Sequence, residues 1–184
     1  DGVAALERGA GGFTHLFNAM SGMHHRAPGI VGAARSPHAR YAEIIPDLVH
    51  VHPGAILAAA RARSPCLYCV TDSTAAAGMP DGEYRLGRHS VTKCLGGVRL
   101  ADGTLAGSTL TMDQAPRNLV DARPSDRATH RACLTSRRRL PRSGATAGAW
   151  SRGRARRPSW LLDAATCTLQ RVVVEGEEID LADA

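Results

Sequence analysis

The chain has 184 residues, a formal net charge of +6 at neutral pH and five irregularly spaced cysteines. It contains no run of about 18 apolar residues, so we expect no transmembrane helix, and the odd cysteine count does not indicate a disulfide framework. A complete (β/α)8 barrel needs roughly 200 residues or more, which excludes a whole barrel from a chain of this length. Because the sequence starts at Asp1, without a Met and inside a predicted helix, we expect the C-terminal part of a longer protein.

The positive charge is confined to one segment. Residues 121–160 hold eleven arginines and two acidic residues, whereas the rest of the chain holds 12 basic and 15 acidic residues, a net charge of −3. The sequence therefore predicts a mildly acidic globular protein without a nucleic-acid or membrane partner. A nucleic-acid-binding protein that uses the arginine-rich segment is an alternative of a different class.

The first 72 residues alternate between helical and strand-like patterns. In chain order, the predicted elements are a helix that ends at Gly9, a short strand that leads to His15, a turn of helix at 30–34, a strand over 41–52, a helix over 54–63 and a strand over 66–72. This alternation is typical of a parallel sheet. A polar residue, His15, His50 or Asp72, lies at the end of each strand-like run, which is where α/β barrels carry their sites.

Residues 66–69 read Cys-Leu-Tyr-Cys, a spacing shared with redox and zinc motifs. On a strand, residues three apart point to opposite faces, so the two sulfurs would diverge. We therefore expect buried thiols in a reduced cytoplasm.

From Ser73 onward the pattern becomes rich in turns. Short β runs are predicted at 90–94 and 97–100, a helix at about 109–121 and a hairpin around residues 175–176. Within the predicted helix, Leu110, Ala115 and Leu119 are expected to face inward. Residues 122–160 show no helical or strand period. They fit either a disordered basic linker or, in our hypothesis, a segment translated in a shifted reading frame, because structureless inserts of this length are uncommon in compact enzymes.

Residues Thr14–Met20 read T-H-L-F-N-A-M, and Arg26–Gly29 read R-A-P-G. The pair closely resembles the signature of N-acetylglucosamine-6-phosphate deacetylases, which belong to the metal-dependent amidohydrolase superfamily. The resemblance implies that His15 binds the catalytic metal, that Asn18 and Ala19 contact the sugar, and that Arg26 contacts the phosphate.

Asp72 lies in V-T-D-S, which is similar to the family segment V-T-D-[AS]. The resemblance implies that Asp72 is the general acid and base, whereas a structural helix cap is the alternative reading. Leu105, Ala106 and Gly107 are similar to a family segment that closes over the sugar through backbone contacts.

Residues 47–53 read D-L-V-H-V-H-P and are similar to the family element D-G-x-H-V-x-P. The resemblance implies that His50 contacts the substrate near its phosphate, while His52 falls at a variable position. A His-x-His metal pair formed with His50 is the alternative. Leu48 stands where the family has Gly.

The fold class implied is α/β: the C-terminal part of a (β/α)8 TIM-like barrel of amidohydrolase type, with strands of a small accessory β-sandwich domain. We expect residues 1–121 to form barrel strands and helices, 122–160 to be the aberrant segment and 161–184 to belong to the small β domain. The implied cofactor is a divalent metal ion, zinc first, with iron or another divalent ion as alternatives. The family's other metal ligands, a Glu and a His, have no counterpart in this sequence.

The implied reaction is hydrolysis of N-acetyl-D-glucosamine 6-phosphate to D-glucosamine 6-phosphate and acetate, by a cytoplasmic, homo-oligomeric parent enzyme of amino-sugar catabolism. Its small-molecule partner is the phosphorylated amino sugar. A metal-dependent amidohydrolase of the dihydroorotase or D-aminoacylase type is an alternative. The R-A-P-G run argues against it, because those substrates carry no phosphate.

Overall fold

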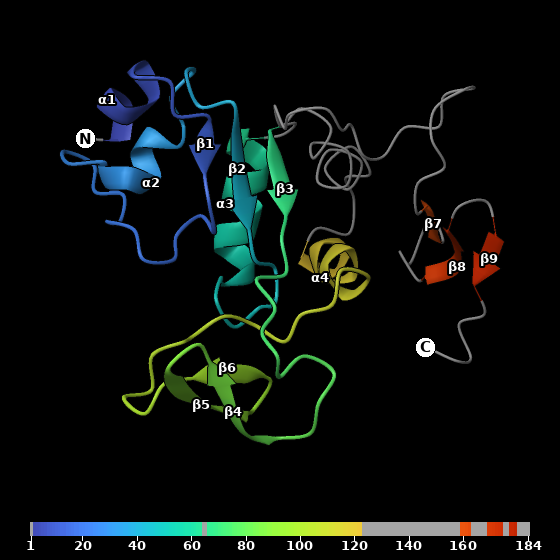
Figure 1. Ribbon diagram of the computed structural model, residues 1–184. Coiled ribbons are helices and arrows are strands. Elements are labelled where there is room, and N and C mark those ends of the chain that lie inside the picture. The colour runs from blue at the N-terminus through green and yellow to red at the C-terminus, as the bar shows by residue number, and fades with distance from the viewer. Residues whose placement is uncertain (1, 64–65, 123–158, 163–168, 175–176, 180–184) are drawn as a thin grey trace.

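The computed structural model describes residues 2–63, 66–122, 159–162, 169–174 and 177–179 (Figure 1). Within these ranges the strands form three separate sheets of three strands each. Two short helices, α1 (Gly2–Glu7) and α2 (Gly29–Ala33), flank the first sheet. None of the helices in these ranges is long and apolar enough to cross a membrane.

The first sheet is parallel, in the order β1 (Gly12–Phe13), β2 (Tyr41–Ile44) and β3 (Leu67–Cys69). Helix α3 (Pro53–Arg63) connects β2 to β3. Proline suits the first turn of a helix, where its missing N–H is not needed. The predicted helix–strand alternation and the parallel pairing are therefore confirmed for these strands.

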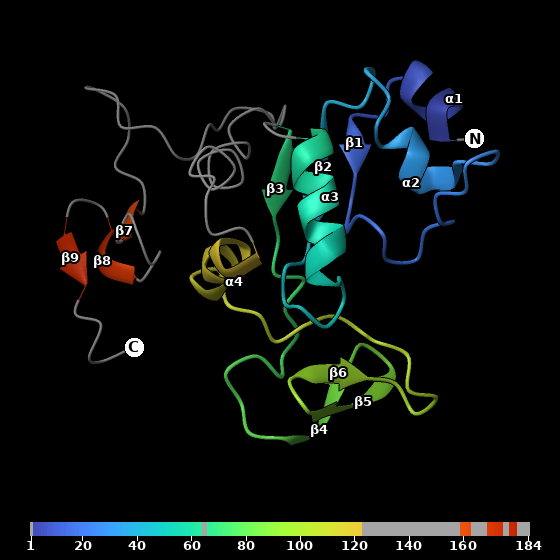
Figure 2. The ribbon, with the colours of Figure 1, turned by 180° about the vertical axis from the view of Figure 1, so that it is seen from behind.

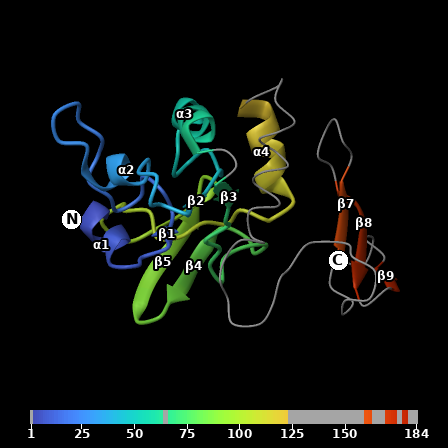
Figure 3. The same cartoon turned by 90° about the horizontal axis from the view of Figure 1, so that it is seen from above.

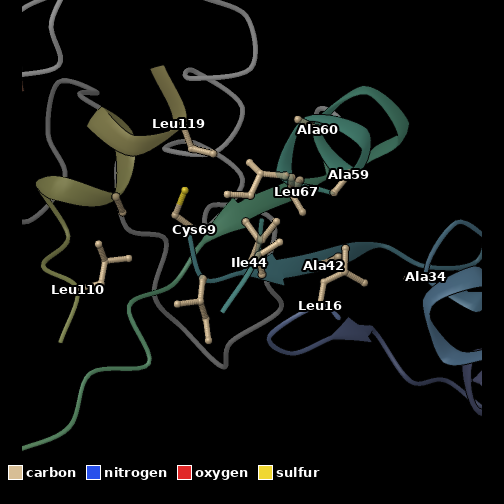
Figure 4. Packing of buried hydrophobic residues seen from close by; sticks show 14 residues of the cluster. Leu16, Ala34, Ala42, Ile44, Ala59, Ala60, Leu67, Cys69, Leu110 and Leu119 are labelled. Carbon is tan, nitrogen blue, oxygen red and sulfur yellow. The ribbon is translucent and has the colours of Figure 1, made fainter. Parts of the chain in front are cut away.

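One face of this sheet carries the main hydrophobic core. Ala42 and Ile44 of β2 are fully buried against α3 (Figure 4). Figure 2 shows α3 lying across the sheet, and Figure 3 shows α4 (Gln114–Ala122) on the same side. Leu110, Ala115 and Leu119 join this core, at 6%, 0% and 3% exposure, so their predicted inward direction is confirmed.

The opposite face carries Tyr41, Glu43 and Tyr68, because side chains alternate along a strand. The rings of Tyr41 and Tyr68 lie 5.8 Å apart. At Gly12 the neighbouring strand comes so close that a Cβ would lie 2.3 Å from the Tyr41 carbonyl oxygen. Only glycine permits this approach of β1 to β2.

The predicted strand over 41–52 is wrong beyond Ile44, and the predicted strand over 66–72 ends at Cys69. After Ile44 the chain leaves the extended conformation, because the Asp47 carboxylate binds nearby backbone N–H groups and Leu48 has a φ of +66°. Side chains that compete for backbone hydrogen bonds in this way favour turns over strands.

The predicted helix over 109–121 begins only at Gln114. Serine hydroxyls take both main-chain groups of Leu110: Ser108 Oγ accepts its N–H at 2.9 Å, and Ser73 Oγ donates to its carbonyl at 2.6 Å. Leu110 therefore lies in a loop that is fixed to the end of β3.

The second sheet is antiparallel and consists of β4 (Gly82–Leu86), β5 (His89–Cys94) and β6 (Gly97–Arg99). The β runs expected at 90–94 and 97–100 are confirmed, whereas β4 was not predicted. Figure 1 shows this sheet beyond the carboxyl ends of β2 and β3.

The third sheet consists of β7 (Ser159–Leu162), β8 (Leu169–Val174) and β9 (Glu177–Ile179), paired antiparallel. The two hairpin strands are confirmed, but the turn at 175–176 lies outside the described residues. Helix α4 ends at Ala122 and strand β7 starts at Ser159, so the expectation that 122–160 lacks regular structure is wrong for residues 122, 159 and 160. Residues 123–158 also lie outside the described residues.

Candidate active site

Three of the predicted site residues lie in loops at one edge of the parallel sheet. His15 follows β1, His50 follows β2 and Asp72 follows β3. Parallel strands have their carboxyl ends at the same edge, and neighbouring strands lie about 4.8 Å apart. The end of β1 and the end of β3 are therefore roughly 10 Å apart across the sheet.

The same loops hold most of the strained backbone. Among the described residues, the non-glycine positions with positive φ are His15 (+31°), Phe17 (+81°), Ala19 (+53°), Leu48 (+66°), Asp72 (+49°) and Leu95 (+51°). All except Leu95 lie in the loops after β1, β2 and β3. Such conformations cost about 1–3 kcal/mol each and cluster at functional sites. Their distribution indicates a site at this edge, independently of residue type.

His15 is oriented by its own loop. Its Nδ1–H donates to the Asn18 carbonyl at 3.0 Å, which leaves the Nε2 lone pair available to a ligand. Metal-binding histidines commonly donate their second ring N–H to a carbonyl in this way. His15 thus fits the role of one metal ligand.

A complete metal site needs more than His15. A catalytic zinc ion usually takes three protein ligands. The part of the chain that the structure describes contains no group of three or more His, Cys, Asp or Glu placed to hold a metal ion. Within the described residues, the chain therefore offers one ligand, His15, to the implied metal ion.

Asn18 braces the same loop. Its Nδ2 lies 3.4 Å from the carbonyl oxygens of His15 and Leu16, and its backbone N–H donates to His15 O at 2.9 Å. Ala19 is exposed on the loop surface. Both predicted sugar contacts therefore lie beside the candidate metal ligand.

His50 is held by Asp47. One carboxylate oxygen lies 2.6 Å from His50 Nδ1, while the other accepts the backbone N–H groups of His50 at 2.8 Å and Val49 at 3.0 Å. Burial raises the pKa of Asp47, but the hydrogen bonds from His50 and Val49 outweigh it, so the pKa lies below its usual value. The pair fixes the His50 ring and leaves Nε2 for a ligand.

His52 caps helix α3. Its Nδ1 accepts the backbone N–H of Gly54 at 3.1 Å, and its carbonyl accepts the N–H groups of Ala55 and Ile56. Because residues 45–52 do not form a strand, the geometry needed for a His-x-His metal pair with His50 is not present.

Asp72 meets the Leu105–Gly107 segment. The Ser108 N–H donates to Asp72 O at 2.8 Å. Gly107 has a φ of +75°, and a Cβ there would lie 2.6 Å from Thr74 Cγ2 and 3.0 Å from Asp72 O. Glycine therefore lets this segment approach the strand end closely.

The Asp72 side chain is exposed and has no hydrogen-bond or ion-pair partner among the described residues. The turn that follows takes its side-chain hydrogen bond from Thr74, whose Oγ1 accepts the Ala76 N–H at 3.3 Å. A capping role for Asp72, the alternative reading of the sequence, has no support in these contacts.

Arg26 lies later in the loop that carries His15, between β1 and α2. It occupies an exposed loop, where its Nη1 donates to His25 Nε2 at 2.7 Å. No hydrogen bond or ion pair joins it to His15, His50 or Asp72 in the described structure. The predicted contact of Arg26 and His50 with one phosphate stays a prediction.

The chain is similar to known deacetylases over most of its length. No family model matches the chain. The N-acetylgalactosamine-6-phosphate deacetylase of Escherichia coli O157:H7 is 43% identical over 140 residues, 74% of this chain and 37% of that protein. The N-acetylglucosamine-6-phosphate deacetylase of Vibrio furnissii is 46% identical over 117 residues, 63% of this chain and 29% of that protein.

A shorter relative from Escherichia coli strain K12, provisionally named an N-acetylgalactosamine-6-phosphate deacetylase, is 43% identical over 129 residues. These are 68% of this chain and 77% of that protein. The chain belongs to the N-acetylglucosamine/N-acetylgalactosamine-6-phosphate deacetylase family.

Solved deacetylases of this family share the chain's α/β arrangement. An Asp-to-Ala mutant of the Mycobacterium smegmatis N-acetyl-D-glucosamine-6-phosphate deacetylase, in complex with N-acetyl-D-glucosamine-6-phosphate, matches with a TM-score of 0.80 at 33% identity. The match covers 96% of this chain and 47% of that one. The chain thus spans about a third to a half of the longer deacetylases it matches.

Leu48 occupies a glycine-like conformation, so we expect Leu48→Gly to stabilise the protein. A left-handed φ costs a non-glycine residue about 1–2 kcal/mol, and glycine's greater freedom in the unfolded chain offsets part of the gain. The free energy of unfolding in urea should rise by about 0.5–1 kcal/mol.

Leu86→Gly is the matched control, because Leu86 is similarly exposed, at 40% against 42% for Leu48, but lies in a regular strand. This substitution should lower the free energy of unfolding by about 1 kcal/mol. Equal losses in the two variants would contradict a strained Leu48.

Asp47→Asn should lower the free energy of unfolding at pH 7 by about 2 kcal/mol, since hydrogen bonds to a charged group are lost. In the folded protein the pKa of Asp47 lies below its ordinary value of 3.8. Its stabilisation is therefore complete above that value and is lost as the pH falls through the folded pKa. In urea unfolding at pH 7, 5 and 3, the difference in the free energy of unfolding between wild type and variant should become smaller only at the lowest pH. A difference that is constant across this range would contradict the ionic role.

Proposed function

We propose that this chain is part of an enzyme that hydrolyses N-acetyl-D-glucosamine 6-phosphate to D-glucosamine 6-phosphate and acetate. N-acetyl-D-galactosamine 6-phosphate is the alternative substrate. The observation that carries the proposal is the placement of His15, His50 and Asp72 in strained loops at one edge of the parallel sheet. The sugar phosphate bound by the Mycobacterium smegmatis enzyme supports the substrate class.

In the complete enzyme, the three parallel strands are part of a (β/α)8 barrel, and the β7–β9 sheet is part of the small β domain. The barrel part extends over residues 1–121. The β-domain part extends over residues 161–184, and strand β7 starts two residues before it, at Ser159. The parent enzyme is a cytoplasmic homo-oligomer.

The proposed chemistry is amide hydrolysis. A divalent metal, when bound, lowers the pKa of water and polarises the acetamide carbonyl. His15 would hold the metal through Nε2, because its Nδ1–H is committed to Asn18 O. Asp72 takes a proton from the attacking water and delivers it to the departing amine. Its free carboxylate is suited to this exchange.

Substrate binding involves the surrounding loops. Asn18 and Ala19 contact the sugar beside His15, and Leu105, Ala106 and Gly107 close over it with backbone groups. Arg26 offers a planar set of donors to the phosphate. His50, fixed by Asp47, offers Nε2 to the same group.

The first test is Asp72→Asn in the complete enzyme. The amide accepts no proton, so kcat for acetate release should fall by about 10²–10⁴-fold, with little change in KM. His15→Asn is the matched comparison and should instead lower the bound metal. Assays with both N-acetylhexosamine 6-phosphates identify the preferred sugar. An Asp72→Asn enzyme that keeps more than half of its activity would remove Asp72 from this role.

Arg26→Ala tests phosphate recognition. Loss of a donor to the phosphate should raise KM for the phosphorylated sugar by about tenfold or more, with a much smaller effect on unphosphorylated N-acetylglucosamine. Arg88→Ala provides the control, because Arg88 is exposed in the turn between β4 and β5. Equal losses on the two substrates would show that Arg26 does not bind the phosphate.

A further inference from the structure

Glu43 joins all three strands of the parallel sheet. It lies in β2, on the face opposite the hydrophobic core. Its Oε2 accepts the Thr14 hydroxyl at 2.6 Å, and its Oε1 accepts the Tyr68 hydroxyl at 2.5 Å. Thr14 directly follows β1, and Tyr68 lies in β3. One carboxylate therefore links both neighbouring strands, through hydrogen bonds that a charged acceptor strengthens.

The main chain of Glu43 adds a third contact. Its carbonyl oxygen accepts the Leu16 N–H at 2.7 Å. Glu43 thus binds the residue before His15 through its side chain and the residue after His15 through its backbone. Between these two contacts, His15 has a φ of +31°, which an unrestrained residue of this type rarely adopts.

The Tyr68 contact extends the link toward Asp72. Tyr68 is 2% exposed, so its ring is fixed by packing, and it lies in the strand that leads to Asp72. The carboxylate of Glu43 therefore connects a buried side chain of β3 to the loop after β1. The connection runs between the two strands whose ends carry His15 and Asp72.

We propose that Glu43 is a positioning residue that holds the His15 loop in register with the end of β3. The role of His15 as a metal ligand rests on the proposed function. The positioning role itself rests only on the contacts of Glu43 with Thr14, Leu16 and Tyr68, so it can be tested separately. A simple packing role for Glu43 would affect both edges of β2 alike.

Amide hydrogen exchange on the 184-residue chain distinguishes these roles. In Glu43→Ala, the Leu16 N–H should exchange at least about tenfold faster than in wild type, since the side-chain anchor of its loop is gone. The Val70 N–H, which donates to Ile44 O on the other side of β2, should change less than about twofold. Thr92→Val, at an exposed threonine of β5, should change neither amide.

The His15 ring gives a second measurement. Its imidazole ¹⁵N signals should report the Nδ1–H form in wild type, because Nδ1 donates to Asn18 O. Glu43→Ala should produce a mixture of the two ring forms, and Glu43→Gln, which keeps one acceptor oxygen, should give an intermediate spectrum. Thr14→Val removes a single contact. If Glu43→Ala does not fold, Thr14→Val tests the same link and should also speed up exchange of the Leu16 N–H.

Equal acceleration of the Leu16 and Val70 amides, an unprotected Leu16 amide in wild type, or an unchanged His15 spectrum in Glu43→Ala would each overturn the proposal. Acetate release from the sugar phosphates is measured separately. If the exchange pattern is as predicted but no acetate is released from either sugar phosphate, the proposed function is wrong and the positioning role of Glu43 still holds.

Discussion

The pairing of β2 with strands on both sides is the constraint on which the candidate site depends. Its backbone fixes the register of β1 and β3, and the Val70 N–H and Leu16 N–H both bind β2 carbonyls beyond the regular strands. Ala42 and Ile44 bury one face against α3. A shift of one residue would exchange this apolar face with the polar one. The positions of the loops that carry His15 and Asp72 follow from this register.

Backbone strain at the strand ends is balanced by local hydrogen bonds. The Asp47 carboxylate holds the turn that contains Leu48, and the Ser108 N–H donates to the carbonyl of Asp72, which is itself left-handed. These bonds keep each conformation populated in the absence of a ligand. A site built this way loses little conformational freedom when a ligand binds.

The sequence predicted the parallel sheet well, because apolar runs, Pro53 and the alanine-rich helix after it are local signals. The ends of elements were less predictable, because side-chain hydrogen bonds that no periodic pattern reveals decide them. Asp47 holds the turn after β2, and Ser73 and Ser108 hold Leu110 in a loop before α4. The Glu43 contacts were missed because they join residues 25 and 29 positions apart in the chain. A charged residue inside an apolar strand was their only sequence signal. The candidate residues came from motif resemblance, and the fold accounts for the shared edge of His15, His50 and Asp72.

The segment that contains β4–β6 leaves the first sheet after β3, and its two ends meet at Ser73 and Ser108. Ser73 bridges Ser108, and the Thr74 N–H donates to Ser108 O at 3.0 Å, so the two ends of the excursion are tied together. The entropy of closing such a loop changes only slowly with its length. Insertions or deletions in the turns of the β4–β6 sheet would therefore leave the end of β3 and the start of α4 in place. Evolution can remodel what covers this edge of the sheet without rebuilding the sheet itself.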